Sequence, residues 1–315
     1  MRKKFIFVMF LFCFTISLFA KNIKVLTPSG LPALSLVKMV NENKQIAGNN
    51  IEYKIEKNSD ALVVDMLKRE GDIAIVPSNF AAQLYNKNLD YVILGTVGWG
   101  SFYIVSDKKI TSLKELKNKQ IYTFGRGLTP DIVLRNILLN NGINLENGIK
   151  INYVTSGNEL PPLFIGGKAN IINIPEPMLS TLIYKDKKAY VNFNLNDIWK
   201  NLYKTKYGYP QSTLVVKKEI LDKNPQFIKS FLENLESSIK FLYGNSDNKN
   251  DYINRLNIMI NMNVIDNILL KANIDFVRID NCKQEYENYF KVLNQFNSKV
   301  LGGNIPDEKI FATFN

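Results

Sequence analysis

The sequence predicts an α/β fold made of two lobes of similar plan. First, short apolar strands and amphipathic helices alternate from residue 23 to residue 174, which is typical of a sheet with helices on both faces. Second, the pattern of the first hundred residues returns in the next eighty, and the apolar strands 71–76 and 169–174 are both followed by proline. Third, no long linker or low-complexity tract interrupts the chain, and a hydrophobic content of 46% suffices for two cores.

The elements follow from the apolar periodicity. Strands are expected at residues 23–27, 51–55, 71–76, 91–96, 102–105, 121–124, 148–153, 169–174 and 209–216. Helices are expected at residues 34–40, 61–69, 111–119, 129–140, 159–164 and 225–243, with another after residue 79. The strand at 102–105 carries the chain to the second lobe, the strand at 209–216 brings it back, and the residues from 244 to 311 are expected to be mostly helical.

A turn at residues 125–131 has the composition of half a small-molecule site. Glycines flank Arg126, and such a turn lets backbone come close to a ligand. Thr129 has the chemistry of an N-cap, Pro130 suits the first helical position, and Asp131 complements the positive helix end. Free N–H groups there favour an anion, and a guanidinium suits a carboxylate, sulfonate or phosphate. Many glycine turns before helices bind nothing, so this turn needs support from the rest of the chain.

The N-terminus has the pattern of a secretory signal peptide. Three basic residues at positions 2–4 precede an apolar run at 5–19, and Ala20 offers a small residue for cleavage. The run is too short for a membrane anchor and does not recur. Cys13 does not fit a lipid-anchor site, because bulky Phe12 precedes it and the apolar run continues past it. We therefore expect a protein that begins near Lys21 in its mature form and works in the periplasm or elsewhere outside the cytoplasm.

Composition excludes several classes of function. Without residues 1–20 the chain has 37 Lys+Arg and 29 Asp+Glu, a mild excess of +8 with no basic block of the kind that binds nucleic acid. The mature chain keeps one cysteine, Cys282, so neither an intramolecular disulfide nor a cysteine-based metal cluster is expected. The chain has no histidine, which removes the usual nucleophile pairs, zinc ligands and general base. We expect no catalytic residue, metal or other cofactor.

Several motifs, in their order and spacing, resemble one family. These are the segment 71–78 (GDIAIVPS), the segment 112–117 (SLKELK) before a strand, the turn at 125–131, the Pro-Glu-Pro at 175–177 and the Tyr-Pro at 209–210. Together they resemble the NMT1/THI5-like group of periplasmic solute-binding proteins, which includes nitrate, sulfonate, taurine and thiamine-precursor binders. The resemblance runs from about residue 24 to about residue 243.

The resemblance implies the fold of type II periplasmic binding proteins, two α/β lobes joined by a two-strand hinge. We expect the signal peptide at residues 1–20, lobe 1 at 21–102 with 213–315, and lobe 2 at 103–212. Ligands of such clamps bind beyond the carboxyl ends of strands, as the lobes close. The candidate ligand-binding residues in the loops there are Ser29, Gly30, Leu31, Ser78, Asn79, Trp99, Gly100, Arg126, Gly127, Thr129, Glu176 and Tyr209.

Individual roles follow from side-chain chemistry. Arg126 and Thr129 suit an anionic group of the ligand, and Ser29, Ser78 and Asn79 suit hydrogen bonds to it. Trp99 fits two roles, stacking on an apolar part of the ligand or packing in the core. Glu176 also fits two roles, accepting a hydrogen bond from a ligand amine or forming a salt bridge near the hinge.

The family resemblance implies the substrate-binding subunit of an ABC importer. It would capture a small organic anion or zwitterion, of sulfonate, carboxylate or pyrimidine type, and deliver it as a monomer to a permease and ATPase pair. The THI5-type enzymes of the family depend on histidine, so their activity is not expected here. Two alternatives stay open: a secreted lyase or transferase with Glu176 or Asp72 as base, and a ligand-sensing domain with the same clamp.

Overall fold

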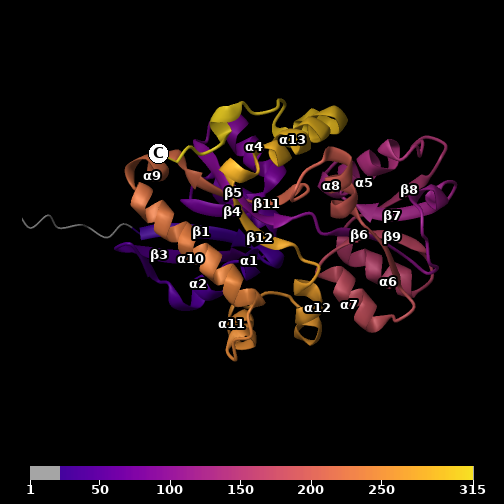
Figure 1. Cartoon of the computed structure of the whole chain (residues 1–315), viewed down its shortest axis with the longest axis horizontal. Helices are drawn as coiled ribbons and strands as arrows, with labels where there is room; N and C mark the ends of the chain where they lie inside the picture. Colours follow the sequence, from indigo (N-terminus) through magenta and orange to yellow (C-terminus); the bar gives the residue numbers. More distant parts are fainter. Residues whose placement is uncertain (1–21, 315) are drawn as a thin grey trace, which may run out of the picture.

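The computed structural model describes residues 22–314 of the chain. The predicted signal peptide and Cys13 lie outside these residues. The described chain contains two β-sheets side by side, each covered by helices (Figure 1). This arrangement confirms the predicted α/β fold with two lobes.

The larger sheet has the strand order β12-β5-β11-β4-β1-β3-β2. Strand β1 pairs in parallel with β3 and β4, and β11 runs antiparallel between β4 and β5. Its strands are β1 (Asn22–Pro28), β2 (Gln45–Ile46), β3 (Asn49–Glu56), β4 (Ile73–Pro77), β5 (Tyr91–Trp99), β11 (Pro210–Lys217) and β12 (Ile274–Arg278). The sheet therefore joins the first hundred residues to two strands from the last third of the chain.

The smaller sheet repeats this plan with the order β10-β6-β9-β7-β8. Strand β7 is parallel to β8 and β9, and β6 runs antiparallel between β9 and β10. Its strands are β6 (Phe102–Ser106), β7 (Gln120–Phe124), β8 (Lys150–Val154), β9 (Ile171–Pro175) and β10 (Tyr190–Asn194). All five come from one continuous stretch. The division of the lobes at 102/103 and 212/213 stays a prediction.

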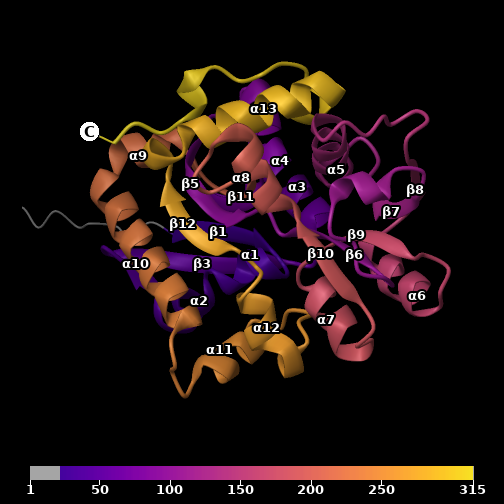
Figure 2. The same cartoon turned by 45° about the vertical axis from the view of Figure 1, so that its right-hand side comes forward.

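Helices cover both sheets. In the larger lobe α4 and α13 lie on one side of the sheet, and α2 and α10 lie on the other (Figures 1 and 2). The helices are α1 (Leu31–Leu34), α2 (Val37–Glu42), α3 (Ser59–Leu67), α4 (Ser78–Asn86), α5 (Thr129–Asn140), α6 (Leu160–Ile165), α7 (Met178–Lys185), α8 (Leu195–Tyr203), α9 (Lys218–Lys223), α10 (Pro225–Tyr243), α11 (Lys249–Arg255), α12 (Ile265–Leu269) and α13 (Lys283–Asn297). Short 3₁₀ helices lie at η1 (Leu113–Leu116), η2 (Gly157–Glu159), η3 (Met262–Val264), η4 (Ile279–Asn281), η5 (Ser298–Leu301) and η6 (Glu308–Ile310).

Helix α10 shows how the apolar periodicity builds the core. Its buried residues recur at helical spacing, and the helix packs against α2 and β12; the buried set includes Phe227, Ile228, Phe231, Leu235 and Ile239. Phe241, near the end of this helix, is only partly buried. Such a stripe supplies most of a helix's stability, because packing contributes more than intrinsic propensity.

The structure differs from the sequence prediction in several elements. Each of the nine predicted strands is present, but β2, β10 and β12 were not predicted. The helix expected at 111–119 is the single 3₁₀ turn η1, and the helix expected at 34–40 is divided into α1 and α2. Strand β12 interrupts a region expected to be mostly helical, because its pairing with β5 decides its conformation.

Two crossings of the chain form the hinge between the sheets. The first, at Gly100 and Ser101, joins β5 directly to β6, and the second joins α8 to β11. The Gly100 N–H donates to the Tyr209 carbonyl at 3.0 Å, so the crossings are bonded to each other. A Cβ at Gly100 would lie 2.2 Å from the Tyr209 ring. Only glycine fits this position without a shift of one crossing.

We therefore predict that Gly100→Ala destabilises the protein by about 1 to 3 kcal/mol, the usual cost of overpacking a core. Denaturant unfolding of the mature protein measures this change. Gly244→Ala is the control, since a Cβ there would have its nearest neighbour at 3.3 Å. Equal stability of Gly100→Ala and the wild type would contradict the close packing of the two crossings.

Candidate functional site

The strand directions bring the predicted loops to two facing sheet edges. Strand β5 enters the hinge at its carboxyl end, and β4 and β1 run parallel to it, so all three end at the edge that faces the smaller lobe. Strand β6 leaves the hinge at its amino end, and β9 and β7 run opposite to it, so they end at the edge that faces the larger lobe. The loops after these five strands carry most of the candidate residues, as expected for a clamp.

Trp99, Gly100 and Tyr209 lie together at the hinge. The Trp99 ring is buried and stacks on Tyr207 with centroids 5.0 Å apart. Its Nε1 has no hydrogen-bond partner among the described residues, so one buried donor is unused. The Tyr209 side chain is fully buried and packs edge-on against Trp199. These contacts make Gly100 and Tyr209 part of the hinge packing.

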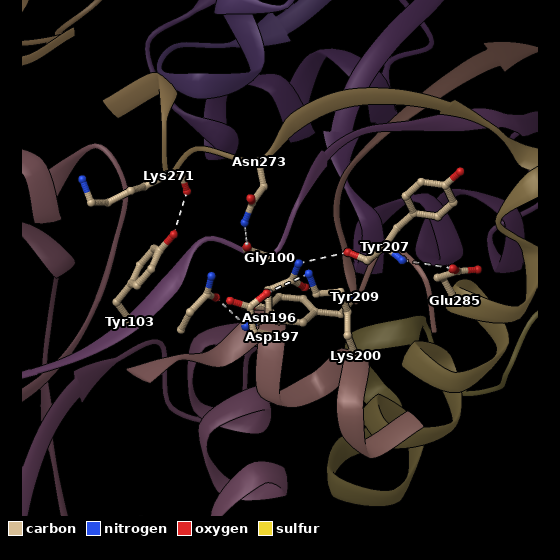
Figure 3. A network of polar contacts seen from close by, with 11 residues as sticks. Gly100, Tyr103, Asn196, Asp197, Lys200, Tyr207, Tyr209, Lys271, Asn273 and Glu285 are labelled. Carbon is tan, nitrogen blue, oxygen red and sulfur yellow. Dashed lines mark hydrogen bonds and ion pairs between the residues drawn. The ribbon is translucent and has the colours of Figure 1, made fainter. Parts of the chain in front are cut away.

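Two asparagine side chains form hydrogen bonds with the backbone of this hinge (Figure 3). Asn273 Nδ2 donates to the Gly100 carbonyl at 2.6 Å, and the Tyr209 N–H donates to Asn196 Oδ1 at 3.1 Å. Asn196 Nδ2 donates in turn to the Tyr207 carbonyl at 2.9 Å. Buried backbone groups of both crossings therefore have partners, which such groups require.

Glu176 is a buried carboxylate between the lobes. It follows β9, is 4% exposed, and accepts hydrogen bonds from the Ser180 hydroxyl at 2.7 Å and the Ser180 N–H at 3.3 Å. Its own N–H donates to the Ser101 carbonyl in the hinge. Burial raises the pKa of Glu176 to about 7, against the opposing effects of the Ser180 hydrogen bonds and the charge of Lys271. Near neutral pH this group can exist as an acid or as a carboxylate.

The residues after β1 and β4 lie at the larger lobe's edge. The Ser29 N–H donates to the Glu56 carbonyl, and Gly30 has φ 102° with open space where a Cβ would be. Leu31 packs partly against the core. Ser78 is buried and accepts from the Thr213 hydroxyl at 2.6 Å, while Asn79 Nδ2 donates to the Val300 carbonyl at 3.4 Å.

The turn at 125–131 differs from its prediction. Leu128 is the N-cap of α5, so Thr129 is the first helical residue and Pro130 the second; Thr129 is not the cap. The buried Asp131 carboxylate accepts the Gly127 N–H at 2.8 Å and the Tyr153 hydroxyl at 2.7 Å. The chain's own carboxylate thus takes an N–H group that was expected to be free for an anion.

The rest of this turn contacts the C-terminal helix or solvent. The Thr129 and Tyr289 hydroxyls are 2.8 Å apart, and Asn297 Nδ2 donates to the Gly127 carbonyl at 3.1 Å. Arg126 is exposed and lies over the Tyr153 ring at 5.0 Å. It forms no salt bridge with any residue between 22 and 314, so its charge is available to a ligand.

The structure joins some candidates directly and not others. Trp99, Gly100, Tyr209 and Glu176 are linked through the hinge backbone. Among the described residues, no hydrogen bond or ion pair links them to Ser29, Gly30 or Leu31, to Ser78 or Asn79, or to Arg126, Gly127 or Thr129. These groups share the two facing edges but form separate contacts.

Sequence reasoning missed the segment at 271–273. Tyr103 of β6 donates its hydroxyl to the Lys271 carbonyl at 2.9 Å, and Asn273 completes the hinge (Figure 3). Recognition of the short strand β12, which directly follows this segment, would have located the segment, because β12 pairs with β5 beside the hinge. The segment therefore ties the last third of the chain to the smaller lobe.

Two further observations concern the described residues as a set. Between residues 22 and 314, no three His, Cys, Asp or Glu side chains are grouped so that they could hold a metal ion. None of the helices in that stretch is both long and apolar enough to cross a membrane.

The burial of Glu176 predicts that Glu176→Gln stabilises the ligand-free protein at pH 8. The pKa of Glu176 rises on folding from its ordinary 4.5 to about 7. Between these two pH values Glu176 ionises in the unfolded state but stays largely protonated in the folded state, so the free energy of unfolding of the wild type falls as the pH rises through this range. The gain at pH 8 is roughly 2 to 3 kcal/mol, and it shrinks towards pH 5. Denaturant unfolding at both pH values tests this, with the exposed Glu287→Gln as control. A gain that does not depend on pH would contradict the prediction.

Comparisons with known proteins agree with this architecture. Residues 99–249 match the family model described as NMT1/THI5 like, and no curated protein matches the chain in sequence. An ABC transporter protein from Parabacteroides distasonis superimposes with a TM-score of 0.81 and 22% identity, over 94% of this chain and 100% of that one. The periplasmic aliphatic sulphonate binding protein SsuA from Escherichia coli gives 0.75 and 13%, over 92% and 91%.

The periplasmic nitrate-binding protein NrtA from Synechocystis PCC 6803 gives a TM-score of 0.57 and 12% identity, over 90% of this chain and 84% of that one. These neighbours share the mixed α/β fold of the chain, which confirms the predicted fold class. Residues 99–249 are therefore similar to the NMT1/THI5-like family, and the chain has the fold of the periplasmic binding proteins to which it is similar.

Proposed function

We propose that this protein is the extracytoplasmic substrate-binding subunit of an ABC importer and captures a small organic anion or zwitterion between its lobes. The observation that carries the proposal is the convergence of strand ends from two similar sheets on one hinge. A buried carboxylate, Glu176, and an unpaired guanidinium, Arg126, lie at these ends. The similar proteins support the proposal, since they are named as an ABC transporter protein and as sulphonate-binding and nitrate-binding proteins.

Binding without catalysis fits the arrangement of carboxylates. Asp72, the other candidate base, precedes β4 at its amino end, on the sheet edge opposite Ser78. It pairs there with Lys217 at 2.8 Å and accepts the Lys24 N–H at 3.0 Å. Asp72 thus does not lie beside Glu176, and the two carboxylates cannot share general acid–base catalysis. The protein acts by binding its ligand more tightly in the closed than in the open form.

Glu176 and Arg126 recognise opposite kinds of group on the ligand. Glu176 accepts a hydrogen bond from an N–H or O–H group of the ligand, which replaces water at a buried carboxylate. Arg126 binds an anionic group, and Trp99 Nε1 or the hydroxyls of Ser29 and Ser78 contact the rest of the ligand. A molecule with both a donor and an anionic group matches these residues best.

The cellular setting follows from the same proposal. Residues 1–20 direct export and are removed, and the mature monomer works in the periplasm or an equivalent extracytoplasmic space. Lobe 1 comprises residues 21–102 with 213–315, and lobe 2 comprises residues 103–212. The liganded form docks on a permease that an ATPase drives, and no metal or other cofactor takes part.

We predict that the mature protein, refolded to remove bound ligand, is stabilised by one class of compound in a thermal-shift screen of sulfonates, nitrate, carboxylates, amino acids and pyrimidines. A ligand at about one hundred times its Kd adds roughly 2.7 kcal/mol. Mass spectrometry must recover the compound unchanged. Conversion to a product would establish an enzyme instead, and a screen without any stabilising compound would reject this ligand class.

For the compound found, Arg126→Ala should weaken affinity by about 1 to 3 kcal/mol, as for a charged hydrogen bond. The melting temperature of the empty protein should stay the same, because Arg126 is exposed and lies over the Tyr153 ring. Arg255→Ala is the control for affinity, since Arg255 is an exposed arginine that lies over Tyr252 at 5.6 Å and pairs with Asp251 at 2.6 Å. Unchanged affinity in Arg126→Ala removes this residue from the site.

A further inference from the structure

A small polar pocket lies between the two lobes, beside Glu176 but apart from the hinge. Ser180 and Tyr184 of α7 and Lys187 after it form one side, and Asn267 of α12 and Lys271 after it form the other. Its volume is about 110 Å³, well above the roughly 10 to 15 Å³ that a cavity needs to hold one water. We call it the α7/α12 pocket.

The two sides of the pocket belong to different sheets. Helix α7 follows β9 of the smaller sheet, and the segment after α12 leads into β12 of the larger one. Figures 1 and 2 both show α12 beside α7, and the two helices are in contact. The pocket therefore exists only when the lobes are close together.

The pocket brings together two lysines without counter-ions. Neither Lys187 nor Lys271 forms a salt bridge with any residue that the structure describes. Lys187 lies over the Tyr184 ring at 5.4 Å, and Lys271 Nζ donates to the Asn267 carbonyl at 3.4 Å. Like charges repel, and more strongly where water is partly excluded. An anion between them would turn this repulsion into attraction.

Nearby carboxylates do not fill this role. Asp266 pairs with Lys249 at 3.6 Å, and Asp186 accepts the Lys188 N–H at 2.9 Å. Glu176 lies behind Ser180, whose hydroxyl hydrogen it takes. Its charge acts on Lys271, but it is buried and does not line the pocket. The pocket is thus lined by two lysines that none of these carboxylates pairs with, and by Asn267.

We propose that the α7/α12 pocket binds a small oxyanion, either free or as the anionic group of a larger ligand, and that Lys187 and Lys271 hold it from opposite lobes. The bound anion neutralises the repulsion between the lysines and so favours the closed arrangement. This site is distinct from the Arg126 turn, and it does not require the cargo of the protein to be an anion.

The test is calorimetric titration of the mature protein with sodium sulfate, at constant ionic strength kept with sodium chloride. The wild type should show saturable binding. Lys187→Gln and Lys271→Gln should each weaken it about tenfold, the loss for one charge-assisted contact. The matched control is Lys188→Gln, one position along the same loop, which lies outside the pocket and should change affinity less than twofold, about the effect of a distant exposed charge.

Two more variants sharpen the result. Glu176→Gln at pH 8 should tighten sulfate binding, because it removes the negative charge that acts on Lys271 from behind Ser180. Arg126→Ala should leave sulfate binding unchanged, and loss of binding there would move the site to the turn at 125–131 and overturn the proposal. The two sites use different residues, so Arg126→Ala in the cargo assay and the lysine variants in this assay distinguish failure of one proposal from failure of the other.

A second titration, with 3-aminopropanesulfonate, distinguishes the two sources of the oxyanion, because this probe carries its anionic group on a larger molecule. Saturable sulfate binding that needs both lysines identifies a free-ion site. Binding of the aminosulfonate alone, with the same need for both lysines, identifies a group of a larger ligand. No binding of either probe, or binding that survives Lys187→Gln with Lys271→Gln, overturns the proposal. Dependence on one lysine only contradicts the bridge between lobes.

Discussion

The hydrogen bond between the Gly100 N–H and the Tyr209 carbonyl is the contact on which the two-lobed structure depends. It joins the two crossings of the chain, and a side chain at Gly100 would collide with the Tyr209 ring. Asn196 and Asn273 form hydrogen bonds with the neighbouring backbone groups. The hinge is therefore a short hydrogen-bonded network that aromatic side chains surround. The residues proposed to bind the transported ligand, such as Glu176 and Arg126, lie at or after strands whose carboxyl ends face this hinge.

Two buried carboxylates near this contact have different environments. Asp131 is satisfied by the Gly127 N–H and the Tyr153 hydroxyl, and it holds the turn before α5 in shape. Glu176 has Ser180 as its side-chain partner, and burial raises its pKa to about 7. The first carboxylate is therefore structural, and the second retains capacity for a ligand donor. The position of each carboxylate near a helix end did not distinguish the two in the sequence, because the difference depends on which residues contact them in the folded chain.

Much of the fold could be predicted from the sequence, because the local spacing of apolar residues determines most of its strands and helices. All nine predicted strands and the long helix α10 are present. The unpredicted strand β12 is short and acquires its conformation from β5, a partner about 180 positions earlier. The site was predicted less well for the same reason: the loops at strand ends were found, but the contacts of Arg126, Lys271 and Asn273 depend on long-range packing. No local pattern shows that Asp131 takes the Gly127 N–H or that Lys187 and Lys271 share a pocket.

The strand order also has a consequence for how the chain folds during synthesis. The smaller sheet is complete once residue 194 is available, whereas β4 and β5 of the larger sheet stay separated until β11, ending at Lys217, is inserted between them. Until then both strands present open edges, and unpaired edges are sites of misassociation. The last third of the chain thus controls when the larger lobe can complete its sheet, long after the smaller lobe has all of its strands.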